Sequence, residues 1–228
     1  MILITGASKG IGGYLFNEYL RMGHEVFGTY LSTAPQDNSG RLSQVDVSSY
    51  SNVENWFNVI KGRADGPITL VSCAAVNYNE MAHRSEPAKW EHVIHVNVVG
   101  VFNAIRCVLP TMRAQGSGTI INISSVVAQV PTIGVSAYAT SKAALWGLTK
   151  SLAAENSAKG VTVNCINLGY ANIGMGVHDV PAATQSLLKE RIPTKRFCEP
   201  MEIFETVEFL RRNCYMTGTS IDLNGGLL

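Results

Sequence analysis

Residues 1–12 read Met1-Ile2-Leu3-Ile4-Thr5-Gly6-Ala7-Ser8-Lys9-Gly10-Ile11-Gly12, and this stretch decides the fold. Its first five residues form a short apolar run of the kind that is buried on both faces of a parallel sheet. Three glycines follow at a Gly-x3-Gly-x-Gly spacing, and apolar side chains then recur at helical intervals up to Met22. A strand, a glycine loop and a helix in this order are the setting of a dinucleotide-binding fingerprint. Taken alone, the loop could also be an ordinary turn.

Within that fingerprint each glycine has a physical task. We expect Gly6 and Gly10 to let the main chain approach a pyrophosphate, and Gly12 to let the helix pack closely on the strand. The N-terminus of the helix would add amide donors and positive potential toward the same phosphates.

Short apolar strands alternate with helical segments along the rest of the chain. Further strands are expected at residues 25–30, 43–47, 68–73, 118–124, 161–167 and 220–223. Further helices are expected at residues 51–60, 87–113, 136–155, 182–191 and 199–212. This alternation predicts a parallel sheet with helices on both faces and right-handed crossovers. No repeat, low-complexity tract or linker interrupts it, so we expect residues 1–228 to form a single domain, with a substrate lid at about residues 171–193.

The composition narrows the class of protein. Hydrophobic residues make up 46% of the 228 residues and charged residues 15%, which is enough apolar material for one large α/β domain. A net charge of +1 gives no support for a nucleic acid or an anionic membrane as partner. The five cysteines are odd in number and lack any CxxC spacing, so free thiols fit better than a disulfide framework or a metal site. The run before Gly6 is too short and uncharged for a signal peptide, so we expect a soluble cytoplasmic protein.

The segment Tyr138-Ala139-Thr140-Ser141-Lys142 lies in a run of good helix formers and is the candidate for the chemistry. Tyr138 and Lys142 are four residues apart, so their side chains share one helix face. A free phenol has a pKa of about 10 and holds its proton at neutral pH. A neighbouring ammonium favours the phenolate and brings that pKa closer to the working pH, which suits a proton donor. The alternative is a pair on an ordinary solvated helix face.

Asn97 lies in the middle of the predicted helix 87–113, in the otherwise apolar run Val96-Asn97-Val98-Val99. An amide in such surroundings is costly unless it finds hydrogen-bond partners. We interpret it as a candidate functional residue, with a plain packing amide as the alternative.

The end of the second strand predicts the cofactor. In NAD-binding versions of this arrangement an acidic residue closes that strand and binds the ribose hydroxyls. Here the segment is Thr29-Tyr30-Leu31-Ser32-Thr33, and no acidic residue follows before Asp37. The missing carboxylate removes repulsion toward a 2′-phosphate, while Lys9, Ser32 and Thr33 could supply a charge and hydroxyl donors. The sequence therefore predicts NADP(H) rather than NAD(H), with Lys9 as an ordinary solvated lysine as the alternative.

Taken together, these residues resemble the short-chain dehydrogenase/reductase family, and within it the bacterial 3-oxoacyl-[acyl-carrier-protein] reductase type. The resemblance covers essentially the whole chain and rests on Thr5-Gly6-x3-Gly10-Ile11-Gly12, Asp46, Asn97, Ser125, Tyr138-x3-Lys142 and Asn224-Gly225-Gly226. It implies a Rossmann-like, doubly wound, seven-stranded and mostly parallel sheet with helices on both faces. It also implies a nicotinamide cofactor across the carboxyl ends of the strands and a homo-oligomer, a homotetramer or a homodimer.

The resemblance assigns a role to each candidate catalytic residue. Tyr138 would be the general acid for carbonyl reduction, and Lys142 would lower its pKa and hold the ribose hydroxyls of the nicotinamide. Ser125 would bind the substrate oxygen, and Asn97 would hold a water that links Lys142 to solvent. We choose Ser125 over Ser124 because it lies thirteen residues before Tyr138, the usual interval. The implied cofactor-binding residues are Gly6, Ser8, Lys9, Gly10, Ile11, Gly12, Ser32, Asp46 (at the adenine edge), Val47, Ala74, Tyr138, Lys142, Gly169 and Ile173.

The chain departs from the family pattern at several positions. Ser72-Cys73-Ala74-Ala75 replaces Asn-Asn-Ala-Gly after the fourth strand, which puts a methyl group where the main chain passes the cofactor. Leu168-Gly169 replaces Pro-Gly, and Ile173 replaces a threonine that often contacts the carboxamide. Gly116 stands where carrier-protein reductases carry one of two docking bases, while Lys159 keeps the other. These changes weaken the case for a carrier-protein substrate.

The sequence therefore predicts an NADPH-dependent carbonyl reductase that acts on a 3-oxoacyl thioester or a small biosynthetic ketone. One alternative is a relative of the nucleotide-sugar epimerases and dehydratases, although only about 60 residues follow Asn167 to form a substrate domain. The other is a non-catalytic NADP(H)-sensing protein, which would have no need of Asn97, Ser125, Tyr138 and Lys142 together. The expected ligand is a small carbonyl or alcohol, with no metal, nucleic acid or membrane.

Overall fold

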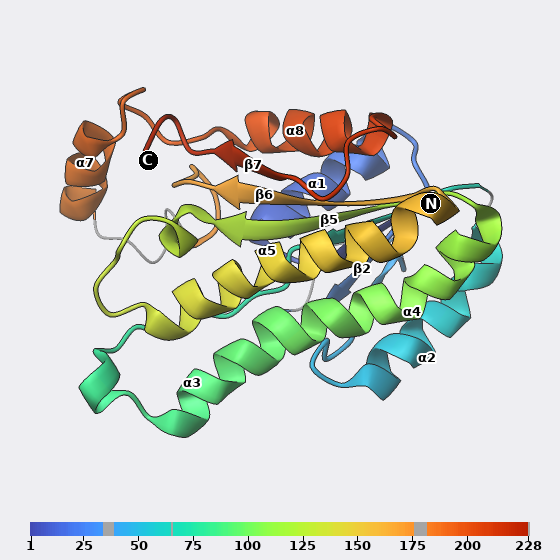
Figure 1. Cartoon of the computed structure of the whole chain (residues 1–228), viewed down its shortest axis with the longest axis horizontal. Helices are drawn as coiled ribbons and strands as arrows, with labels where there is room; N and C mark the ends of the chain where they lie inside the picture. The colour runs from blue at the N-terminus through green and yellow to red at the C-terminus, as the bar shows by residue number, and fades with distance from the viewer. Residues whose placement is uncertain (34–38, 65, 176–181, 228) are drawn as a thin grey trace.

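The structure is a computed structural model that describes residues 1–33, 39–64, 66–175 and 182–227 (Figure 1). Seven strands form a parallel sheet in the order β3-β2-β1-β4-β5-β6-β7. Their bounds are β1 Ile2–Thr5, β2 Val26–Tyr30, β3 Leu42–Gln44, β4 Ile68–Ser72, β5 Gly118–Ser125, β6 Val161–Leu168 and β7 Ser220–Leu223. The strand order reverses between β1 and β4, and ligands of open α/β sheets bind in the crevice at the carboxyl ends beside such a reversal.

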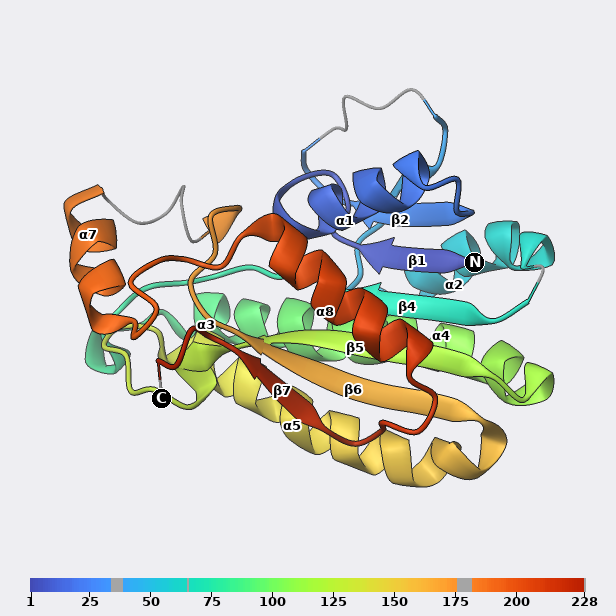
Figure 2. The same cartoon turned by 90° about the horizontal axis from the view of Figure 1, so that it is seen from above.

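Helices cover both faces of the sheet (Figures 1 and 2). One face carries α1 (Gly10–Arg21) and α8 (Pro200–Arg212). The other carries α2 (Tyr50–Ile60), α4 (Gly100–Gln115) and α5 (Ser136–Asn156). Two helices, α3 (Pro87–Ile94) and α7 (Ala182–Arg191), extend past the carboxyl ends of the strands. The predicted doubly wound Rossmann-like fold is confirmed.

Alternation along the strands produces two apolar layers. Leu70 and Ile120 are fully buried with Leu145 under the helices of one face, whereas their neighbours Val71 and Ile121 are fully buried under α1 and α8. Successive side chains of a strand point to opposite faces, so a strand that is apolar throughout is buried on both sides. The predicted apolar strands are therefore the central strands of the sheet.

Two predicted elements differ from the structure. The third strand was expected over residues 43–47 but spans Leu42–Gln44, because the chain turns at Asp46, whose carbonyl accepts from Ser49 N at 3.1 Å. The helix expected over residues 87–113 has an interruption of one π-helical turn, His95–Val99, between α3 and α4. The other boundaries either match the prediction or differ from it by at most two residues.

The helical run from α3 through α4, residues 87–115, is long and apolar enough to cross a membrane by length and composition alone, with a mean hydropathy of 1.6. It is the one such helix in the described part of the chain, and 56% of its apolar window is buried inside the fold. A buried core helix meets the same criterion, so this run is weak evidence for a membrane span.

Candidate active site

The predicted site residues gather at one edge of the sheet because they follow the carboxyl ends of parallel strands. Residues 6–12 follow β1, Ser32 follows β2, Asp46 and Val47 follow β3, Ala74 follows β4, Ser125 ends β5, and Gly169 and Ile173 follow β6. Tyr138 and Lys142 reach this edge from the first turns of α5. The fold therefore explains why residues far apart in the chain form one group.

The glycine loop meets the stereochemical demands predicted for it. Gly6 and Gly10 have φ angles of +67° and +57°, a region in which a side chain is strained. A Cβ atom on Gly12 would lie 2.3 Å from the carbonyl oxygen of Gly6, so only glycine allows α1 to pack this closely on the loop. A Cβ atom on Gly6 would lie 2.8 Å from the Cα atom of Ala74, so the loop also packs against the end of β4.

The start of α1 fits a cofactor pyrophosphate. The residue before the helix, Lys9, is exposed and its side chain does not cap the helix, and the first turn carries no acidic side chain. Free amide N–H groups and the helix dipole therefore favour an anion at this point. The Thr5 hydroxyl accepts hydrogen bonds from Cys73 N at 3.2 Å and Ala74 N at 3.1 Å, which joins the end of β1 to the chain after β4. Ser8, in the loop before α1, and Ile11, in the first turn of α1, are both partly buried.

Side-chain hydrogen bonds hold the chain after β3, where the adenosine part of a cofactor would bind. The carboxylate of Asp46 accepts from Ser48 N at 2.9 Å and from Ser48 Oγ at 2.7 Å. Asn103 on α4 donates to the carbonyls of Val47 and Ser48 at 3.0 and 3.1 Å. Ser32 is exposed after β2, and Asp37 lies outside the described residues. The contact of Asp46 with adenine stays a prediction.

Tyr138 and Ser125 meet at the carboxyl end of β5. Burial raises the pKa of the Tyr138 phenol to about 12, and its hydrogen bond with the Ser125 side chain acts in the opposite direction. The phenol therefore keeps its proton at neutral pH. The neighbouring Ser124 is buried and its Oγ donates to the carbonyl of Lys142 at 2.8 Å. Strand alternation turns the two serines to opposite sides, and Ser125 is the one beside the phenol.

Lys142 lies beside Tyr138 but is directed past it. Its Nζ atom lies 5.4 Å from the centroid of the Tyr138 ring and donates to the carbonyl of Ile123 at 2.8 Å. Burial lowers the pKa of the ammonium to about 8. In this arrangement the ammonium donates to a main-chain acceptor on β5, and burial has the largest effect on the pKa of the phenol, with Ser125 opposing it. The role implied for Lys142 in lowering the pKa of Tyr138 stays a prediction.

The side chain of Asn97, in the π-helical turn, is fully paired. Its Oδ1 atom accepts from Val76 N at 2.8 Å, and its Nδ2 atom donates to the carbonyl of Val76 at 2.9 Å and to Ser141 Oγ at 3.0 Å. These bonds explain how an amide with no exposed surface is tolerated in an apolar helix. They correspond to the packing alternative, while the water-holding role implied by the resemblance stays a prediction.

The chain after β6 passes close to the glycine loop. Gly169 N donates to the carbonyl of Leu223 at 2.9 Å, and Ile173 packs, partly buried, against the apolar layer under α1 and α8. A Cβ atom on Gly10 would lie 3.5 Å from the Cα atom of Gly174, so the start of the predicted lid lies against the glycine loop. Helix α7 belongs to the same predicted lid, of which residues 176–181 lie outside the described residues.

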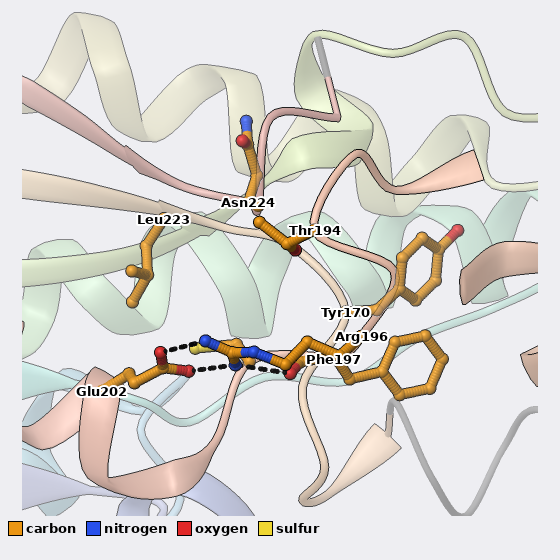
Figure 3. Close-up of a pocket in the computed structure, with 9 residues that line it drawn as sticks. Tyr170, Thr194, Arg196, Phe197, Glu202, Leu223 and Asn224 are labelled. Carbon is orange, nitrogen blue, oxygen red and sulfur yellow. Dashed lines mark hydrogen bonds and ion pairs between the residues drawn. The ribbon is translucent and has the colours of Figure 1, made fainter. Parts of the chain in front are cut away.

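Sequence analysis missed a cavity of about 170 Å³ beside this edge (Figure 3). Its lining residues are Tyr170, Thr194, Arg196, Phe197, Cys198, Glu202, Leu223, Asn224 and Gly225. Leu223, Leu168 and Ser125 are register partners on β7, β6 and β5, so the cavity begins two strands, roughly 10 Å, from Ser125. The Nδ2 atom of Asn224 is buried and has no hydrogen-bond partner among the described residues.

Sequence analysis also missed two hydroxyl groups that shape the site, those of Thr5 and Ser141. Ser141 lies three residues after Tyr138, and its Oγ atom donates to the Tyr138 carbonyl at 2.7 Å. That spacing was a usable signal, because serine often bonds to the preceding turn of its own helix.

Comparisons with known proteins agree with this geometry. A family model described as short chain dehydrogenase matches residues 1–182. An acetoacetyl-CoA reductase from Rhizobium meliloti is 37% identical over 238 residues, which cover 98% of this chain and 96% of that protein. The 3-oxoacyl-[acyl-carrier-protein] reductase FabG from Staphylococcus epidermidis is 32% identical over 242 residues, covering 99% and 97%. The ligand-free aldohexose dehydrogenase (AldT) of Thermoplasma acidophilum is similar with a TM-score of 0.89 and 27% identity, covering 99% of this chain and 93% of that one.

Proposed function

We propose that this chain, which belongs to the short-chain dehydrogenase family, reduces the 3-oxo group of an acyl thioester to a 3-hydroxyl group with NADPH. As a member of that family it is an oxidoreductase that uses a nicotinamide cofactor and interconverts carbonyl and alcohol groups. The observation that carries the choice of substrate is the similarity to acetoacetyl-CoA reductases over 98% of the chain.

The chemistry needs a hydride on carbon and a proton on oxygen, and this chain supplies the proton. A bound reduced nicotinamide supplies the hydride. We place the substrate carbonyl oxygen between the Ser125 hydroxyl and the Tyr138 phenol, where both donate hydrogen bonds as negative charge develops on that oxygen. The Tyr138 proton then passes to the oxygen, and the resulting phenolate takes a proton back from solvent before the next turnover. Because burial raises the pKa of the Tyr138 phenol to about 12, the phenol is protonated at neutral pH and can donate this proton.

The cofactor would be held along the whole carboxyl edge. The glycine loop, residues 6–12 with Ser8, Lys9 and Ile11, would hold the pyrophosphate, and Asp46 with Val47 would meet the adenine. Ala74, Gly169 and Ile173 would line the remaining path. The Lys142 ammonium would hold ribose hydroxyls, since it is partly charged near pH 8 and lies beside the phenol.

We further propose a preference for NADPH over NADH. Ser32 and Lys9 are both exposed and could donate to a 2′-phosphate, and β2 ends without a carboxylate that would repel it. The measurement is the ratio of kcat/KM for the two cofactors, and a higher value with NADH would refute this preference.

The substrate proposal is tested with purified protein, acetoacetyl-CoA and NADPH, followed at the nicotinamide absorbance. We expect NADPH consumption with acetoacetyl-CoA, and consumption by Tyr138→Phe that is slower by about 10²–10⁴ under the same conditions. Reduction of simple cyclic ketones without reduction of acetoacetyl-CoA would refute the thioester, and no consumption with any carbonyl would refute the reductase.

We also infer a cytoplasmic homo-oligomer, a dimer or a tetramer, in which residues 171–193 act as the substrate lid. The support for self-association is Phe102 on α4, a large apolar side chain with 45% of its surface exposed. Light scattering of the purified protein measures the assembly, and a monomer at working concentration would contradict it.

A further inference from the structure

We infer that Ser141 is a positioning residue for Tyr138, because its buried hydroxyl joins the main chain of Tyr138 to the amide of Asn97. The inference rests on the proposed carbonyl reduction, since it concerns the placement of the proton donor. Ser141 has no exposed surface, so a substrate that enters from solvent cannot contact its side chain.

The two bonds of the Ser141 hydroxyl have a fixed direction. A hydroxyl has one proton, and the Oγ atom donates it to the Tyr138 carbonyl at 2.7 Å. Asn97 Nδ2 must therefore be the donor in the 3.0 Å bond to Ser141 Oγ. The same orientation of the amide lets Asn97 Oδ1 accept from Val76 N at 2.8 Å. Every donor and acceptor is matched, so the amide cannot flip without loss of at least one bond.

These bonds fix the start of α5 from one side. They run from Val76, in the chain after β4, through Asn97 in the π-helical turn to the main chain of Tyr138. From the other side, Ser124 Oγ on β5 donates to the carbonyl of Lys142 at 2.8 Å. The helical turn that carries the phenol is therefore held between β5 and the π-helical turn. A misplacement of about 1 Å in a proton donor can cost about a hundredfold in rate.

Helix α5 offers a matched control for loss of a buried hydroxyl. Thr149 has no exposed surface, and its Oγ1 atom accepts from Asn122 Nδ2 at 3.0 Å. Thr149→Val and Ser141→Ala therefore each remove from α5 one hydroxyl that accepts a hydrogen bond from an asparagine amide, Asn122 on β5 or Asn97 in the π-helical turn. Only Ser141 also bonds to the Tyr138 carbonyl and to Asn97.

The experiment measures kcat and KM for acetoacetyl-CoA and NADPH in the wild type, Ser141→Ala and Thr149→Val, together with the unfolding temperature of each. We expect Ser141→Ala to lower kcat about tenfold or more, with both KM values within about threefold, because the loss lies in placement of the donor and not in binding. We expect Thr149→Val to keep kcat within about twofold of the wild-type value, even if it lowers the unfolding temperature as much as Ser141→Ala does. Ser141→Cys, which keeps nearly the same volume with a weak donor, carries the test should the alanine variant not fold.

Three results would overturn the inference. A kcat of Ser141→Ala, or of Ser141→Cys in its place, equal to that of the wild type overturns the inference and leaves the proposed function standing. An equal loss of kcat in Thr149→Val also overturns it, because the effect would then be general loosening of α5. No turnover in the wild type overturns the proposed function and this inference with it.

Discussion

Replacing Lys142 by methionine should stabilise the protein at neutral pH, and this gain should shrink as the pH rises. Lys142 is 4% exposed, and burial lowers the pKa of its ammonium from an ordinary value of 10.5 to about 8. A change of one pKa unit corresponds to about 1.36 kcal/mol, so the buried charge costs the folded state about 3 kcal/mol below pH 8. Methionine has a similar length and no charge, so it removes this cost.

The direction of the pH dependence follows from proton binding. Below pH 8 both the folded and the unfolded wild type carry the charged lysine, and the full cost is present. Between pH 8 and pH 10.5 the unfolded chain binds more protons than the folded chain, so the stability contribution of Lys142 rises with pH. From about pH 7 to about pH 10 the advantage of Lys142→Met should therefore fall by about 2.5 kcal/mol. Methionine also loses the bond to the Ile123 carbonyl, worth about 1 kcal/mol, but this loss is the same at both pH values.

The assay is urea unfolding of the wild type and Lys142→Met at these two pH values and one protein concentration. Ionisations shared by the two proteins cancel in the difference between their free energies of unfolding. Lys150→Met, at an exposed position of the same helix, controls for the loss of one positive charge. A difference that stays constant to within about 0.5 kcal/mol would refute the reasoning, because the ammonium would then have an ordinary pKa in the folded state. The variant should also lose turnover, since a buried charge with a net cost in stability is kept for its function.

Three further predictions concern other side chains. Tyr138→Phe should lower kcat by about 10²–10⁴, the usual contribution of general acid catalysis, while NADPH still quenches or shifts protein fluorescence; unchanged turnover would exclude Tyr138 as the donor. Ser32→Asp places a carboxylate after β2 and should lower kcat/KM for NADPH at least about tenfold without such a loss for NADH; equal losses with both cofactors would contradict the proposed phosphate position. Glu208→Gln should lower the free energy of unfolding by about 1–3 kcal/mol at neutral pH, because burial would raise the pKa of Glu208 but hydrogen bonds with Arg211 and Tyr19 lower it to about 2. This deficit in the free energy of unfolding should disappear as the pH falls from 4.5 toward 2, where Glu208 becomes protonated in the folded protein. A deficit that persists in urea unfolding down to pH 2 would contradict a stabilising role of the ionised carboxylate.

The fold was largely predictable because its signals are local. The apolar strands, the Gly6–Gly12 loop and the alternation with helices each depend on residues close together in the chain, and the structure has them where expected. The end of β3 was predicted too late because Val45 and Val47 stay buried beyond the last strand residue, Gln44, although the chain turns at Asp46, between them. Apolar periodicity reports burial, and burial alone does not separate a strand from a buried turn.

The candidate site was predictable in its members and less so in its contacts. The spacing of Tyr138 and Lys142 correctly predicted a shared helix face. It could not predict the direction of the ammonium, because the Ile123 carbonyl that binds it lies on a neighbouring strand, nineteen positions away. The link from Asn97 to Ser141 spans 44 positions, and the cavity at Asn224 needs segments on both sides of the lid. Contacts of this kind depend on how β5, β7 and the π-helical turn are brought together in three dimensions.

The bonds around the start of α5 share one property that bears on how the site keeps its geometry. Ser124, Ser141, Lys142 and Asn97 are all buried, and each bonds to at least one main-chain group, at Lys142, Tyr138, Ile123 and Val76 respectively. Main-chain groups keep their positions as long as the sheet and the π-helical turn form, whatever side chains surround them. The placement of the phenol therefore depends on four side chains and the fold itself. Departures from the family pattern beside the site, such as Cys73 and Leu168, can then change ligand binding without moving the proton donor.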